Sequence, residues 1–368
     1  MKDILFTMFY GSVAMLSLLA SIYLLFRRGN AIAPEITPPV RLRRWTAAFF
    51  ACMTLSHLWY LPTVFFTSGD SIDMTFYIGG LLDCMTIFPL AIAVLFVMLQ
   101  DRRRPLWPIA VMVVPFIVVI VACMFNHKTT FMFQLLQGYF LLMGIGLIIY
   151  MVREVRQYGQ WLRDNFADLE DKEVWQSYLV LAAILLVFGF YMSGYRGLGY
   201  EYCVQVGDIM LTCYLLWRVE TLSDLSISQQ NLYSIEDDLI TTEDIEGNGL
   251  SATSSDSIGL LLQEHCIDTQ LYLQHDLTLS QLARAIGTNR TYLGQYFSNQ
   301  GMTYNAYIND LRIDYFISVY REAVAMKHHF TAQQLAHKSG YRSYSTFALA
   351  FKQRMGQTVT TWMLDSAK

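Results

Sequence analysis

Seven long apolar runs fill the first 217 residues of this 368-residue chain and constrain its fold more than any other feature. Five of the runs contain no Asp, Glu, Lys or Arg, and the other two contain one carboxylate each, Asp83 and Asp208. About 20 apolar residues in a helix span a bilayer core, and a helix satisfies every backbone amide internally. We therefore predict an all-α fold that starts with a seven-helix membrane bundle. The predicted spans are 4–26, 45–66, 75–99, 105–125, 130–152, 174–194 and 202–217.

The Lys and Arg residues between the runs predict the orientation of the bundle. With the N-terminus outside, the inner segments 27–44, 100–104 and 153–173 together with Arg218 hold 13 Lys and Arg, whereas the outer segments hold three. Cytoplasmic loops of membrane proteins carry an excess of Lys and Arg. The count therefore predicts an outer N-terminus and, because seven spans is an odd number, a cytoplasmic C-terminus.

Three polar side chains inside the predicted spans, His57, Asp83 and Asp208, are candidate residues of a signal-binding site. Each is costly in hydrocarbon, so we expect all three to face the interior of the bundle. Ionisable groups in membrane helices often belong to ligand or ion sites. The plainer interpretation is a buried carboxyl group that is hydrogen-bonded to a neighbouring hydroxyl or amide. The sequence leaves both interpretations open.

A change in charge divides the rest of the chain. Residues 219–256 hold nine Asp and Glu and no Lys or Arg, whereas residues 277–364 hold nine Lys and Arg and three Asp and Glu. The acidic stretch ends in 247-GNGLSATSSD-256, a composition typical of a flexible tether. A basic, compact domain suits a polyanionic partner. The predicted domains are a transmembrane domain over 1–218, an acidic flexible linker over 219–257 and a basic helical domain over 258–368.

Two similar segments lie 53 residues apart in the basic domain, 278-TLSQLARAIGTNRTYLGQYF-297 and 331-TAQQLAHKSGYRSYSTFALAF-351. Each opens with a Thr suited to cap a helix, and each has a Leu-Ala pair followed four residues after the Ala by a Gly. A second helix with apolar residues four apart follows the Gly. This layout predicts two helix-turn-helix units, joined by a long helix over 303–325. The residues expected to form their cores are Leu282, Ala283, Leu293, Phe297, Leu335, Phe347 and Phe351.

The pair of units resembles the DNA-binding domain of AraC/XylS-type transcription regulators over about 265–364. The second unit carries most of the resemblance, and Arg312 stands where the family has an Arg early in the connecting helix. The resemblance implies a cytoplasmic domain that binds double-stranded promoter DNA. Family members often bind tandem half-sites as dimers, so a homodimer is one option. The residues of the second unit that match the family spacing are Gly340, Tyr341, Ser343, Phe347, Phe351, Lys352 and Gly356.

The resemblance also implies roles for individual residues. Departures from the family pattern are Gly294, which offers no side chain, Ala348 and Leu349, where the family often has a polar residue and an Arg, and Val359 in place of Pro. The second unit is therefore expected mainly to hold the phosphate backbone. Candidate base contacts are Asn289, Thr291, Gln295, Tyr344 and Thr346. Candidate phosphate contacts are Arg290, Arg342, Lys352 and Arg354.

The sequence contains no Ser/His/Asp arrangement, clustered acid pair, Gly-rich phosphate loop or metal-ligand spacing. We therefore expect no catalytic residues, no metal and no cofactor. The prediction is a membrane-embedded bacterial transcription regulator in the inner membrane, controlled by an unknown signal ligand from the bilayer or the outside. One alternative is a transporter or membrane enzyme with an accessory helix-turn-helix tail. Another is a tail that serves protein contacts.

Overall fold

The computed structural model of the protein describes residues 4–27, 29–34, 36–62, 69–105, 107–125, 129–174, 182, 198–225, 255–326 and 330–366. In these residues every regular element is a helix, apart from an isolated antiparallel bridge between Phe166 and Thr278. The predicted all-α class is confirmed. The chain divides into two compact units, Met1–Tyr158 with Val174–Gln229 and Gly159–Glu173 with Gln230–Lys368.

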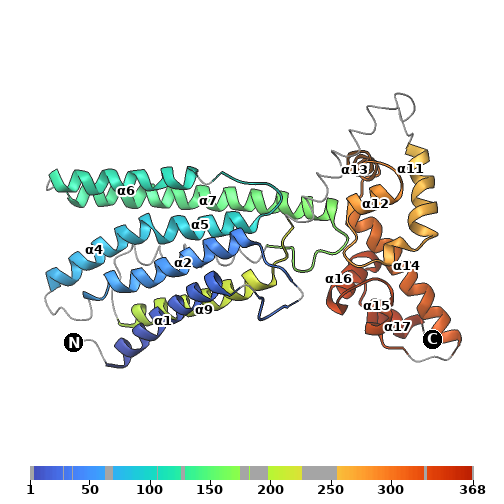
Figure 1. The fold of residues 1–368 in the computed structure, drawn as a ribbon, viewed down its shortest axis with the longest axis horizontal. Helices are drawn as coiled ribbons and strands as arrows, with labels where there is room; N and C mark the ends of the chain where they lie inside the picture. Colours follow the sequence, from blue (N-terminus) through green and yellow to red (C-terminus); the bar gives the residue numbers. More distant parts are fainter. Residues whose placement is uncertain are drawn as a thin grey trace. The chain divides into compact units, whose positions relative to one another are not determined.

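The first unit is a bundle of long helices (Figure 1). It contains α1 (Ile4–Phe26), α2 (Val40–Trp59), α4 (Gly69–Met85), α5 (Ile87–Met98), α6 (Trp107–Phe125), most of α7 (Thr129–Asn165) and α9 (Leu198–Thr221). Helix α2 packs against α1, α4, α5 and α9, and α6 packs against α4 and α5. The hydroxyl of Tyr139 on α7 donates to the carbonyl oxygen of Met112 on α6 at 3.3 Å. Phe49 and Phe50 of α2 are fully enclosed in this packing.

Three helices of the described residues are long and apolar enough to cross a bilayer: Ile4–Phe26, Ile78–Met98 and Gln134–Asn165. A shorter apolar helix covers Ile109–Val118. The predicted count of seven spans is thus corrected to three in this part of the chain. The predicted span 174–194 lies outside the described residues, apart from positions 174 and 182.

Charged residues explain why two of the predicted spans, 45–66 and 202–217, are not among the helices apolar enough to cross a bilayer. Helix α2 begins at Val40, upstream of the predicted run, and so takes in a basic cluster. Helix α9 is longer than the predicted run 202–217 and carries charged residues at both ends as well as in the middle. The charged residues are Arg41, Arg43 and Arg44 in α2, and Glu201, Asp208, Arg218 and Glu220 in α9.

Two of the three candidate spans expose most of their apolar side chains. Only 28% of the α1 span and 25% of the α7 span is buried within the protein. Met8 and Leu19 on α1, and Leu142 and Ile149 on α7, are among the exposed large side chains. An apolar surface of this extent is uncommon on a soluble monomer and marks a membrane or partner interface.

The second unit holds the two predicted helix-turn-helix units (Figure 1). Its helices are α11 (Ser255–Leu262), α12 (Leu279–Ala285), α13 (Arg290–Asn299), α14 (Tyr304–Ala325), α15 (Ala332–Lys338), α16 (Tyr344–Met355) and α17 (Val359–Ser366). Thr278 and Thr331 begin α12 and α15, as predicted. Each hydroxyl accepts the backbone N–H three residues later, of Gln281 or Gln334, at 3.2 Å, and each Gln side chain accepts the Thr backbone N–H in return.

Two apolar cores, one for each helix-turn-helix unit, are linked by α14. Ile308 of α14 belongs to the first core, whereas Ile313 and Phe316 of the same helix belong to the second. The prediction of the core residues is confirmed, since all are buried. These residues are Leu282, Ala283, Leu293, Phe297, Leu335, Phe347 and Phe351.

The second unit also includes residues 159–173, which the sequence had placed in an inner loop of the membrane domain. These residues are the end of α7 and the stretch that follows it. Residues 226–254, which make up most of the predicted linker, lie outside the described residues. The C-terminal helices therefore form one compact body with residues 159–173, and bonded residues such as Asp168 and Asp276 are 108 positions apart in the chain.

Candidate nucleic-acid interface

Both helix-turn-helix turns use a glycine with positive φ. Gly287 follows α12 with φ 71° and Gly340 follows α15 with φ 87°. The second turn is also crowded, because a Cβ on Gly340 would lie 2.8 Å from the carbonyl oxygen of Leu273 and 3.0 Å from Nε of Arg312. A Cβ on Gly287 would meet no atom within 4 Å. Glycine is required for backbone conformation at both turns and for space at Gly340.

The first reading helix, α13, presents two of its predicted base-contact residues to solvent. Thr291 and Gln295 are exposed and lie one turn apart on the same face. Asn289 is exposed as well, and its Oδ1 accepts the backbone N–H of Tyr292 at 2.8 Å, so that it also caps the helix. The half-buried Arg290 is also engaged, since its Nε donates to Oδ1 of Asn165 at 2.9 Å.

The second reading helix, α16, has less free polar surface at the predicted positions. Ser343 caps the helix by accepting the backbone N–H of Thr346 at 3.3 Å. The Thr346 hydroxyl donates to Oε2 of Glu170 at 3.0 Å. Tyr344 is half-buried against the second core, with its ring 5.9 Å from that of Phe347. Leu349 is 60% exposed one turn further along the helix.

Acidic partners hold two of the other predicted phosphate contacts. Arg342 forms an ion pair with Asp276. Arg354 contacts Asp310 at 3.1 Å and Asp314 at 2.8 Å. Burial raises the pKa of the Asp310 carboxyl, and the nearby Arg354 opposes that rise. The exposed Lys352 has no ion pair within the described part of the chain. With Arg290 bonded to Asn165, three of the four predicted phosphate contacts are engaged inside the unit.

Arg312 is fully buried at the centre of the second unit. Its Nε donates to the carbonyl oxygen of Tyr272 at 2.8 Å, and one terminal nitrogen donates to that of Gln274 at 2.8 Å. The other terminal nitrogen lies 2.7 Å from Oδ1 of Asp168. The guanidinium carbon is 5.4 Å from the centroid of the Tyr341 ring. A buried charge requires such partners, and sequence reasoning missed Asp168 because it lies 144 residues from Arg312.

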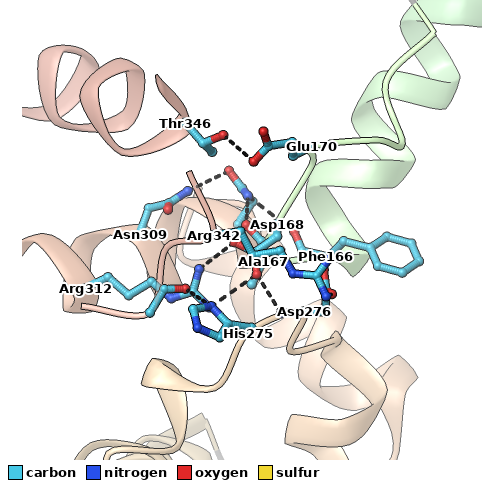
Figure 2. A network of polar contacts seen from close by, with 12 residues as sticks. Phe166, Ala167, Asp168, Glu170, His275, Asp276, Asn309, Arg312, Arg342 and Thr346 are labelled. Atoms are coloured by element: carbon cyan, nitrogen blue, oxygen red, sulfur yellow. Dashed lines mark hydrogen bonds and ion pairs between the residues drawn. The ribbon is translucent and has the colours of Figure 1, made fainter. Parts of the chain in front are cut away.

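The residues 166–173, FADLEDKE, form a segment that lies against the helix-turn-helix domain (Figure 2). The Ala167 backbone N–H donates to the carbonyl oxygen of Leu277 at 3.0 Å. The Asp276 backbone N–H donates to Oδ2 of Asp168 at 2.7 Å, and Lys172 lies 3.1 Å from the Asp276 carboxylate. Ala167 is part of the first core. The 166–173 segment is therefore built into the fold of this unit.

The candidate signal-site residues all lie in the first unit. His57 contacts Oε1 of Gln205 at 3.0 Å, and its Nε2 is 3.9 Å from the Asp208 carboxylate. Asp83 accepts hydrogen bonds from the side chains of Trp59 at 3.2 Å and Tyr60 at 2.9 Å. The structure thus brings His57 and Asp208 together, whereas Asp83 is held by an aromatic pair.

Gln205 is the residue of this site that sequence reasoning missed. It lies three positions before Asp208 on α9, a spacing that places both side chains on one face of a helix. That spacing is the signal that would have pointed to it. Within the described residues, no group of three or more His, Cys, Asp or Glu is arranged to hold a metal ion.

Comparison with known proteins supports the interpretation of the second unit. A helix-turn-helix domain family model matches residues 282–364, which run from α12 into α17. No curated protein and no solved structure matches the chain. Residues 282–364 are thus similar to an AraC-type helix-turn-helix domain, which supports double-stranded DNA binding by a transcription regulator.

Proposed function

We propose that this protein is a membrane-embedded transcription regulator that binds promoter DNA and responds to a signal received in its membrane part. The observation that carries the proposal is the joining, in one chain, of an AraC-type helix-turn-helix domain and helices with outward-facing apolar surfaces. Such a chain functions only where membrane and genome share a compartment. The proposed location is therefore the bacterial inner membrane, as a multi-pass protein with a cytoplasmic C-terminal domain.

The membrane part of the proposal covers residues 1–218, connected by the acidic tether 219–257 to the domain 258–368. Support comes from the basic segments between the helices, which suit the cytoplasmic side of a bilayer. One of these segments is ordered by ion pairs: the buried Arg104 lies 2.8 Å from Glu154 and 2.7 Å from Asp101. The exposed surfaces of α1 and α7 suit contact with lipid.

The DNA-reading part of the proposal rests on the exposed face of α13 and on the first turn of α16. Thr291 and Gln295 are the best placed base contacts, because both are exposed on α13. A Gln side chain pairs well with the edge of adenine in the major groove. In α16, Tyr344 and Thr346 are the proposed base contacts. The proposed phosphate contacts are Arg290, Arg342, Lys352 and Arg354, and three of these must first give up an internal partner.

The signal-reading part of the proposal is the cluster of His57, Asp208 and Gln205, together with Asp83 on α4. Polar groups in a membrane bundle favour a site for a polar or ionic ligand. Binding there would act on promoter binding through α7 or through the tether. A homodimer would present two domains to tandem half-sites.

The test uses the full chain, purified into lipid nanodiscs, and selection of duplexes from a random-sequence pool. We expect enrichment of one sequence, with affinity that falls steeply as salt rises. The variant Thr291→Ala/Gln295→Ala should lose about 1–3 kcal/mol of discrimination at the bases it reads. Gln300→Ala, at the opposite end of α13, is the matched control and should leave the selected sequence unchanged. Absence of both enrichment and salt-dependent binding would contradict the proposal.

A second candidate function is a transporter or membrane enzyme with an accessory helix-turn-helix tail. The pair of His57 and Asp208, 3.9 Å apart inside the helix bundle, favours this alternative. The variant Asp208→Asn distinguishes the two functions. A transporter would lose solute flux and keep its DNA selectivity, whereas a regulator would keep DNA binding but no longer change it in response to the signal.

A further inference from the structure

The 166–173 segment is held in place by a buried ion pair. Asp168 and Arg312 have side chains that are 5% and 0% exposed, and their closest atoms lie 2.7 Å apart. The backbone bond from Ala167 to Leu277 and the bridge between Phe166 and Thr278 fix the segment at the start of α12. The side-chain amide of Asn305 on α14 donates to the carbonyl oxygen of Phe166 at 3.3 Å. The segment is thus tied to both α12 and α14.

From this fixed position the chain reaches one residue of each reading helix. Just before the segment, Asn165 accepts hydrogen bonds from Arg290, the first residue of α13. Within the segment, Glu170 accepts the hydroxyl hydrogen of Thr346, in the first turn of α16 (Figure 2). A third predicted DNA-contact residue, Arg342, is held indirectly. It pairs with Asp276, which is itself bonded to Asp168 and Lys172 of the segment.

These contacts lie where DNA would bind. In helix-turn-helix proteins the N-terminal residues of the reading helix contact base edges and nearby phosphates. The N-terminus of a helix carries partial positive charge and favours an anion. The Glu170 carboxylate occupies such a position at α16, and four of the eight residues 166–173 are acidic. A DNA phosphate would compete with these groups for the same donors.

We propose that residues 165–173 are a built-in competitor of DNA, which occupies Arg290 and Thr346 until DNA or a signal displaces it. The inference rests on the proposed function, since it names the regulation of the same DNA-binding surface. Asn165 is the last residue of α7, and α7 includes the candidate span Gln134–Asn165. The competitor thus follows directly, along the chain, on a candidate membrane span.

The competitor has a fixed part and a releasable part. Removal of Asp168 would leave Arg312 buried without its charge partner, which is strongly destabilising. Glu170 is half-buried and accepts from Thr346, whereas Asn165 is buried and bonds both Arg290 and, through its Nδ2, the carbonyl oxygen of Trp161 at 2.6 Å within α7. Substitutions at Asn165 and Glu170 therefore test competition while the ion pair keeps the segment folded.

The test measures binding of the full chain in lipid nanodiscs to a random-sequence 40-base-pair duplex, by fluorescence anisotropy at several salt concentrations. Random duplex reports phosphate contacts and needs no known promoter. We expect the variant Asn165→Ala/Glu170→Ala to bind about tenfold more tightly than wild type, which corresponds to about 1.4 kcal/mol. Glu322→Ala removes the same charge from an exposed site on α14 and should leave affinity nearly unchanged.

A second variant guards against a folding defect. Glu170→Gln keeps an oxygen that accepts from Thr346 but removes the negative charge, so it should also tighten binding, by less than the double variant. If wild type binds and both variants bind equally or more weakly, the competitor is disproved while the proposed function stands. If wild type and all variants show no salt-dependent binding, the proposed function itself fails, and the inference fails with it.

Discussion

The two helix-turn-helix units share their internal construction but differ in the surface that each offers to DNA. Both start with a Thr capping box, and both turn at a glycine with positive φ. On the first reading helix Thr291 and Gln295 are exposed, whereas on the second Thr346 is bonded to Glu170 and Leu349 is exposed. The comparison teaches that core and cap residues preserve the motif while its reading surface changes independently.

Substitution of the buried Arg312, which lies between the two helix-turn-helix units, should give the largest loss of stability. Arg312→Ala leaves the buried Asp168 carboxylate unpaired, so we expect a loss of about 3–5 kcal/mol of unfolding free energy. Exchange of the buried backbone amides, measured in the native state, should then speed up on the order of a hundredfold or more in both helix-turn-helix units. Arg321→Ala, on the exposed face of the same helix, is the matched control. Faster exchange in only one unit would show that the two units unfold independently.

The two turns provide the next test of the comparison. Alanine at either Gly287 or Gly340 must adopt positive φ, which costs roughly 1–2 kcal/mol. Gly340→Ala should cost clearly more, because its Cβ would also meet the carbonyl oxygen of Leu273 at 2.8 Å. Hydrogen exchange or chemical unfolding of the two variants measures the difference. Equal losses would mean that the chain around Leu273 moves aside without cost.

Loss of the N-terminal helix cap should lower stability equally in the two helix-turn-helix units. Thr278→Ala and Thr331→Ala each remove one capping box, and each should lower stability by about 1 kcal/mol. The measurement is the exchange rate of amides in α12 and in α15. Serine at either position restores the hydroxyl and serves as the control. A loss at one Thr alone would show that tertiary packing, rather than the cap, holds the other helix.

The smallest expected effect is a change in DNA affinity at the reading surface of the second helix-turn-helix unit, on α16. Leu349→Arg adds a cation on the exposed face of α16, so affinity for random duplex should rise and its salt dependence should steepen by a slope of about 0.9 for one added phosphate contact. Leu364→Arg adds the same charge on α17, where Leu364 is 64% exposed. Equal effects of the two substitutions would mean that charge alone, and not the position on α16, decides binding.

The sequence by itself determined the local features of both helix-turn-helix units, namely their helix starts, turns and core residues. Helix starts at Thr278 and Thr331, the turn glycines and the buried Leu293 and Phe347 were all predictable, because each depends on residues within a few positions along the chain. Apolar runs likewise predicted an all-α fold. Within the described residues they overstated the number of spans, since a run of apolar residues does not show where a helix begins and which charges it takes in.

Only the tertiary structure decided which distant residues meet. Asp168 and Arg312 are 144 positions apart, and Glu170 and Thr346 are 176 apart. The count of Lys and Arg placed residues 153–173 in an inner segment of the predicted membrane domain, but the charge of Asp168 is satisfied by an arginine that folding buries beside it. The type of a charged side chain limits which groups can pair with it. The free energy of burial then selects one partner among them. That selection depends on the tertiary fold, so no local sequence pattern contains it.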